Sequence, residues 1–86
     1  MNLDSIREEI ESIDDDILRL LAKRMELAPV IGKYKKENGL AITQPEREKS
    51  LVAMHVKQGK ELGLEPEFVK ELYKLIMQEM RKKQCE

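Results

Sequence analysis

The N-terminal part of the chain carries one regular apolar pattern, and this pattern limits the folds that the chain can adopt. Steps of four and three residues alternate from Ile6 through Ile10, Ile13 and Ile17 to Leu20, and the pattern continues at Leu27 and Ile31. Such spacing is the a/d seam of a heptad repeat and predicts one amphipathic helix over residues 3–37. Pro29 removes one backbone hydrogen bond, so we expect a kink there, and Asn38-Gly39 ends the helix.

A helix of this length is difficult to cover with the rest of the same chain. At 1.5 Å per residue the helix would be about 52 Å long, and the whole chain has only 86 residues. A domain of this size buries only about 60% of the surface of its unfolded chain, so it gains stability from association. A second copy of the long helix could cover the seam, and we therefore expect an intertwined homodimer.

Two shorter helices follow and complete a single all-α domain that spans residues 1–86. The second helix is expected over residues 44–62, with a capping box between Thr43 and Glu46. The third helix is expected over residues 66–84. The expected inner faces consist of Leu51, Val52, His55 and Leu62 in the second helix and of Val69, Leu72, Tyr73, Ile76 and Met80 in the third. The predicted protomer thus has three helices, of which the first is much the longest.

Composition and charge argue against several classes of function. Charged residues make up 38% of the chain but the net charge is −1, so the basic surface of a nucleic-acid-binding protein is not expected. No apolar run approaches the roughly 20 residues that span a bilayer, and the acidic N-terminus lacks the features of a signal peptide. The single cysteine, Cys85, allows no internal disulfide and no Cys/His metal pattern. We expect a cytoplasmic protein without a metal or cofactor and without nucleic-acid or membrane partners.

Two cations occupy seam positions of the long helix where apolar residues belong. Arg24 and Lys35 each lie four residues beyond an apolar seam position. They are separated by three helical turns, so they share one face with their Cα atoms about 16 Å apart, and Ala28 between them leaves room. Buried cations need an anion. That anion is either Glu48 at the start of the second helix or an external ligand with two carboxylates, which arginine binds in bidentate fashion.

Arg7 and Gln84 are further candidates for the same site. Arg7 precedes Arg24 by about 25 Å along the helix axis, so it cannot reach the site of its own subunit, but in an antiparallel dimer it could complete the partner's site. Gln84 extends the inner stripe of the third helix, where a buried amide would need polar partners. Each residue alone has a simpler explanation, which is a register-fixing salt bridge or a snorkelling side chain for Arg24 and solvation for Arg7. Lysines such as Lys35 are common at helix ends, and Gln84 alone fits a fraying helix end. Only the combination favours a ligand site.

Three sequence motifs connect this combination to a known family. The run Arg7–Asp14 reads R-x-x-I-x-x-I-D, the run Arg24–Lys35 reads R-x-x-L-A-x-x-I-G-x-x-K, and the run Pro45–Glu48 reads P-x-R-E. With these motifs, nearly the whole chain resembles the all-helical class of chorismate mutases. The resemblance implies an intertwined homodimer with two equivalent sites and with chorismate as the small-molecule substrate.

The resemblance also implies a role for most of the candidate residues. Arg24 of one subunit and Arg7 of the other would bind the two carboxylates of chorismate. Lys35 and Gln84 would approach the ether oxygen of the C–O bond that breaks.

The other end of the implied site contains Glu48, which would accept a hydrogen bond from the ring hydroxyl, with Arg47 beside it. Two residues of the implied substrate site depart from the pattern of the family. Gln44 stands where an aspartate is usual, and Met80 stands where a serine is usual. Both departures bear on catalytic efficiency.

The implied reaction, a Claisen rearrangement of chorismate to prephenate, is unimolecular and uses no nucleophile, metal or redox group. An enzyme accelerates it by holding the substrate in a reactive conformation and by placing donors where negative charge grows. Two alternatives remain at the level of the sequence. One is an isochorismate–pyruvate lyase on the same scaffold, and the other is a non-catalytic helical dimer in which Arg24 and Glu48 pair across the seam.

Overall fold

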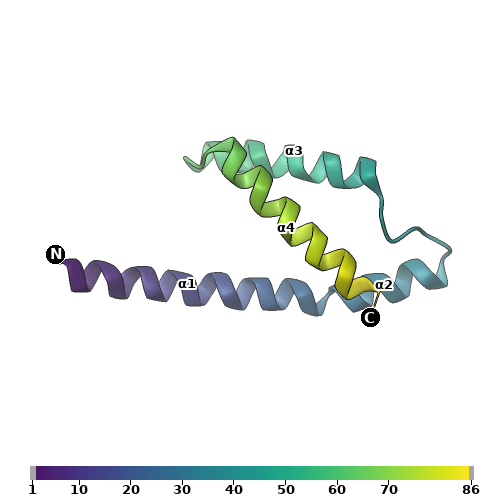
Figure 1. Cartoon of the computed structure of the whole chain (residues 1–86), viewed down its shortest axis with the longest axis horizontal. Helices are drawn as coiled ribbons and strands as arrows, with labels where there is room; N and C mark the ends of the chain where they lie inside the picture. The colour runs from purple at the N-terminus through teal and green to yellow at the C-terminus, as the bar shows by residue number, and fades with distance from the viewer. Residues whose placement is uncertain (1, 86) are drawn as a thin grey trace.

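The computed structural model describes residues 2–85, and all regular secondary structure in this range is α-helical. The helices are α1 (Leu3–Glu26), α2 (Ala28–Glu37), α3 (Pro45–Glu61) and α4 (Pro66–Gln84). Figure 1 shows α1 and α2 in one line, with α3 beside this line and α4 running diagonally between them. The predicted all-α class is therefore confirmed.

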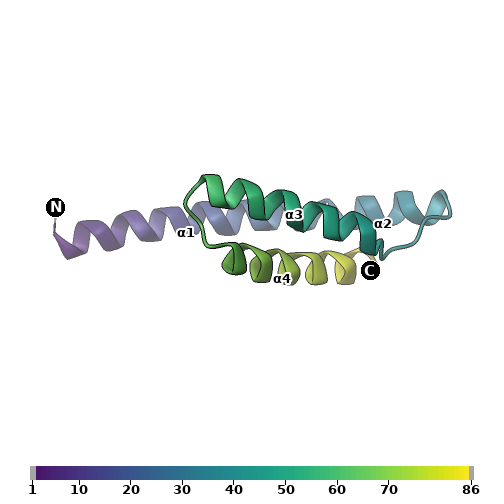
Figure 2. The same cartoon turned by 90° about the horizontal axis from the view of Figure 1, so that it is seen from above.

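Together, α1 and α2 form the long N-terminal helix that the apolar pattern predicts. Leu27 separates them but keeps a helical backbone, with φ −80° and ψ −17°, and its N–H bonds the carbonyl of Arg24 at 3.2 Å. Pro29 lies in the first turn of α2, where a missing N–H costs no intrahelical bond. Because the helical direction continues in both views (Figures 1 and 2), the longest dimension of the molecule is 55 Å. In place of the predicted kink, the helix has a one-residue interruption at Leu27, two residues before the proline.

The start and the end of α3 differ from the sequence prediction. The expected capping box between Thr43 and Glu46 is wrong, because the N-cap is Gln44, whose side chain makes no capping bond. Pro45 at the first helical position fixes φ and has no N–H to satisfy, so the helix can begin without the box. Leu62, expected on the inner face, is 79% exposed, because it is the C-cap at which the chain turns towards α4.

The core lies where α4 crosses the junction of α1 and α2. Ala28, Ile76 and Met80 are buried there, and the partly buried Leu21, Met25 and Tyr73 pack around them. Ala28, expected to leave room for a ligand, is instead completely buried, because its small side chain lets α4 approach. The prediction of an inner stripe in α4 is confirmed for Val69, Ile76 and Met80, whereas Leu72 is 38% exposed.

The N-terminal half of α1 projects away from this core (Figure 2). Its seam residues, Ile6, Ile10, Ile13, Ile17 and Leu20, are between 39% and 66% exposed. The radius of gyration of 16.0 Å exceeds the roughly 12 Å expected for a compact domain of this length. Within residues 2–85, the apolar seam of α1 therefore has no partner over most of its length.

Candidate active site

One cavity of about 260 Å³ lies where the end of α1, α2, α3 and α4 meet. Its lining consists of Arg24, Ile31, Lys35, Ile42, Gln44, Arg47, Glu48, Leu51, Met77, Met80 and Gln84. All the residues that the sequence suggested for a substrate site are therefore in this lining, except Arg7. Arg7 is exposed on the projecting half of α1. Arg24 and Lys35, predicted to share a face, do line the same cavity.

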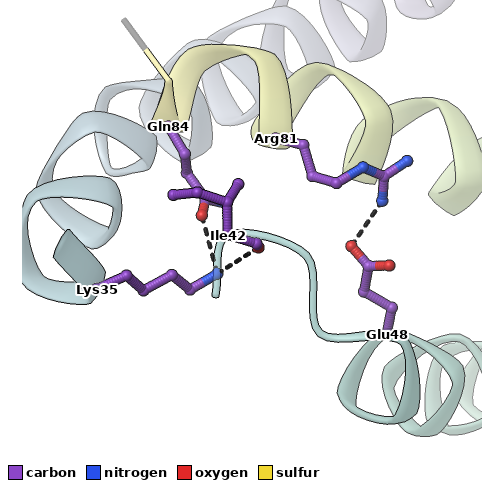
Figure 3. A network of polar contacts seen from close by, with 5 residues as sticks. All are labelled: Lys35, Ile42, Glu48, Arg81 and Gln84. Atoms are coloured by element: carbon purple, nitrogen blue, oxygen red, sulfur yellow. Dashed lines mark hydrogen bonds and ion pairs between the residues drawn. The ribbon is translucent and has the colours of Figure 1, made fainter. Parts of the chain in front are cut away.

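Lys35 of α2 and Gln84 of α4, which both line the cavity, are joined by a hydrogen bond (Figure 3). The Lys35 ammonium donates one hydrogen bond to Gln84 Oε1 at 2.8 Å and another to the backbone carbonyl of Ile42 at 2.9 Å. Since an ammonium has only donors, Gln84 must present its carbonyl oxygen to Lys35. One N–H of Lys35 and the NH₂ group of Gln84 are then left as donors for a ligand.

Gly32 allows the two helices that carry this pair to approach each other closely. A Cβ atom at position 32 would overlap the backbone carbonyl oxygen of Gln84 and would lie 2.9 Å from its Cα. No rotamer change can relieve a clash with backbone atoms. Gly32 therefore determines how near the C-terminal turn of α4 comes to α2, and so the separation of Lys35 from Gln84.

Glu48 forms an ion pair that the sequence did not predict. It was one of two alternatives for the anion that meets Arg24 and Lys35, but its Oε1 accepts from Nη1 of Arg81 at 2.6 Å (Figure 3). The internal alternative is therefore wrong for this structure, because the last turns of α4 lie opposite the first turn of α3 and bring Arg81 to Glu48. A signal for Arg81 was available, since it directly follows Met80 and thus lies at the edge of the apolar stripe of α4.

Other parts of the lining were also missed. Ile31, Leu51 and Met77 supply apolar walls, as expected for residues on the inner faces of helices. Ile42 contributes through its backbone carbonyl in the loop between α2 and α3. A backbone carbonyl leaves no trace in the side-chain pattern, so no sequence signal could have identified it.

The charges around the cavity favour a small anion. Arg24, Lys35 and Arg47 are cationic, and Glu48 is the one acidic residue among the lining residues. The charge of Glu48 is compensated by Arg81, and within residues 2–85 neither Arg24 nor Arg47 forms an ion pair. The cavity therefore keeps a positive potential that suits a ligand with two carboxylates.

The described residues also bear on two other kinds of site. Among residues 2–85, no group of three or more His, Cys, Asp or Glu side chains is arranged to hold a metal ion. No helix in the same range is both long enough and apolar enough to cross a membrane.

Comparison with known proteins relates this chain to one family. Residues 6–85 match the family described as chorismate mutase type II. The chain belongs to the chorismate mutase type II family. The match includes every lining residue of the cavity and also Arg7, so this chorismate mutase family domain extends over almost all of the described residues.

Individual relatives agree with the family match. The chain is 39% identical over 77 residues to a T-protein of Enterobacter agglomerans, covering 90% of this chain and 21% of that protein. A T-protein of Haemophilus influenzae is 32% identical over 90% of this chain and 20% of its own length. A bifunctional chorismate mutase/prephenate dehydratase of Buchnera aphidicola is 40% identical over 85% of this chain and 19% of its own length. The chain thus spans about a fifth of the length of these relatives.

Proposed function

We propose that this chain catalyses the rearrangement of chorismate to prephenate, a step in the biosynthesis of phenylalanine and tyrosine. The observation that carries the proposal is the bonded pair of Lys35 and Gln84 at one end of a cationic cavity. This pair offers two kinds of donor to one oxygen atom, in a chain whose family is chorismate mutase type II.

The reaction requires organisation of the substrate more than chemical participation of the protein. As the C–O bond of the enolpyruvyl ether breaks, a C–C bond forms at the ring, and electrons shift within one cyclic transition state. Negative charge grows on the ether oxygen during this step. Fixed donors that point at this oxygen lower the barrier because they do not have to reorganise.

Lys35 and Gln84 are suited to that task. Two of the three N–H bonds of Lys35 are held by Gln84 and by the carbonyl of Ile42, so the direction of the third N–H is restricted. The Gln84 amide nitrogen lies next to its carbonyl oxygen and can donate to the same ligand atom. Neither residue needs to gain or lose a proton.

The cations bind the two carboxylates of the substrate in this proposal. Arg24 lies on the same helix face as Lys35 and binds one carboxylate, while Arg47 at the rim supports the end of the cavity near Glu48. Arg7 of a partner subunit binds the other carboxylate. Holding both carboxylates keeps the flexible side chain over the ring, which contributes to the rate through proximity.

A homodimer follows from the same proposal, in which two α1 helices pack antiparallel along their seams. The exposed seam residues support it, since burial of each half-exposed Ile or Leu would contribute about 1 kcal/mol. In this arrangement the start of one α1 lies near the end of the other. Arg7, which is too far from the cavity of its own subunit, is then brought to the cavity of the partner.

The decisive test is an assay of chorismate consumption with identification of the product. Appearance of prephenate supports the proposal. Release of salicylate and pyruvate from isochorismate, without prephenate formation from chorismate, would instead assign the lyase reaction. The third outcome is that neither substrate is turned over and that a bicyclic dicarboxylate mimic of the transition state does not stabilise the protein against heat. This outcome would indicate a non-catalytic helical dimer.

A further inference from the structure

Arg81 stands next to the candidate active site without lining the cavity. Its guanidinium reaches from α4 to α3 and donates to Oε1 of Glu48 at 2.6 Å (Figure 3). The two side chains are about one third and one quarter exposed, respectively. The pair is therefore shielded from much of the solvent. A partly buried ion pair is screened less than an ion pair at the surface.

The pairing with Arg81 compensates the negative charge that Glu48 brings to the cavity. Glu48 is the acidic residue of the lining, and a substrate with two carboxylates would be repelled by an uncompensated carboxylate. In an empty cavity, an unrestrained Glu48 would also be attracted to Arg24 and Arg47, because these cations line the same cavity. Either effect would weaken the binding of a dianion.

We propose that Arg81 is a positioning residue that both neutralises Glu48 and directs its carboxylate. Arg81 occupies Oε1, so Oε2 is the oxygen that accepts the hydrogen bond from the ring hydroxyl of the substrate. The proposal rests on the proposed mutase function. In this proposal Arg81 touches no substrate, but it determines the charge and the orientation of Glu48, which does.

This role predicts a specific kinetic signature. The ring hydroxyl does not react, so its bond to Glu48 is equally strong in the ground state and in the transition state. Loss of such uniform binding raises KM and leaves kcat nearly unchanged. A residue that acts on the ether oxygen, such as Lys35, would instead lower kcat.

The experiment compares kcat and KM for chorismate in the full chain and in three variants. Arg81→Met removes the charge and keeps much of the bulk, Arg81→Lys keeps the charge, and Lys82→Met removes the same charge from an exposed neighbour on the same helix. We expect KM to rise about tenfold in Arg81→Met, from loss of a charge-assisted hydrogen bond. We expect kcat to stay within about twofold, Arg81→Lys to recover most of the affinity, and Lys82→Met to resemble the wild type.

A double variant tests whether the effect passes through Glu48. In a Glu48→Gln background there is no carboxylate charge to compensate, so Arg81→Met should raise KM by much less than it does in the wild-type background. Equal increases of KM in both backgrounds would overturn the proposal. Circular-dichroism melting curves of all variants show whether each protein is folded under the assay conditions.

The remaining outcomes separate the two proposals. If the wild type does not form prephenate, the proposed function and this inference fall together. If the wild type is active and Arg81→Met has the same KM as Lys82→Met, this inference alone is overturned, and a fall in kcat without a change in KM overturns it as well. Should Arg81→Met not fold, Arg81→Gln replaces it, and an unchanged KM in that variant is equally decisive.

Discussion

The two ends of the long N-terminal helix both carry apolar residues but differ in what covers them. At the C-terminal end, α4 crosses the junction of α1 and α2, and Ala28 is completely buried beneath Ile76 and Met80. At the N-terminal end, the seam residues from Ile6 to Leu20 remain substantially exposed. The buried end carries Arg24 and Lys35 of the candidate site, whereas the exposed end carries only Arg7. An amphipathic pattern therefore shows that a helix face requires a partner, but not whether the partner lies in the same chain.

The largest expected effect concerns the buried end. Lys35→Ala removes the donor that is proposed to act on the ether oxygen, and we expect a loss of about 3 kcal/mol of transition-state stabilisation, equivalent to a fall in kcat of more than 100-fold. Steady-state kinetics with chorismate measure this effect. Turnover close to that of the wild type in a folded variant would refute the role of Lys35.

The second prediction links the two ends. Arg7→Ala and Lys35→Ala homodimers are each expected to be inactive. Mixing and re-annealing equal amounts should restore about a quarter of the wild-type activity, since about half of the dimers are mixed and each mixed dimer has one intact site. Native mass spectrometry verifies that mixed dimers form. Mixed dimers that remain inactive would show that Arg7 does not complete the site of a partner.

The third prediction tests whether the exposed seam is a dimer interface. Ile13→Asp places a charge on the seam in both copies, and we expect dimerisation to weaken by about 2 kcal/mol. Sedimentation at a series of concentrations measures the change. Leu18→Asp is the matched control, because Leu18 is 65% exposed but lies off the seam. Equal effects of the two substitutions would contradict the proposed antiparallel packing.

The smallest expected effect concerns the spacing of α2 and α4. Gly32→Ala introduces a Cβ that overlaps the backbone of Gln84, so the end of α4 must shift. We expect a loss of about 1–3 kcal/mol in the free energy of unfolding together with reduced kcat. Thermal melting and kinetics measure the two effects. Gly39→Ala is a useful contrast, because a Cβ there would meet no atom within 4 Å but would strain a backbone with φ +65°.

Much of the fold could be predicted from the sequence because its strongest signals are local. The heptad spacing of α1 and the Asn38-Gly39 pair after α2 act within a few residues, and the structure agrees with both. The capping box at Thr43 failed because Pro45 makes it unnecessary. The exposure of Leu62 was missed because a periodic pattern does not show the residue at which the chain leaves its helix.

The candidate site was accessible from sequence to the extent that its residues lie on regular helices. Arg24 and Lys35 could be placed on one face by counting turns. The pairing of Glu48 with Arg81 depends on how α3 and α4 cross, and the bond from Lys35 to Ile42 depends on the path of a loop. Both are tertiary features that no helical periodicity encodes.

The bonds of Lys35 have a consequence for the thermodynamics of ligand binding. A lysine that is freely rotating loses up to about 2 kcal/mol of side-chain conformational entropy when it becomes ordered. Here the Gln84 side chain and the Ile42 carbonyl already order Lys35 in the folded chain. Most of that entropy is therefore lost during folding, and an incoming ether oxygen meets a donor whose immobilisation adds little to the cost of binding.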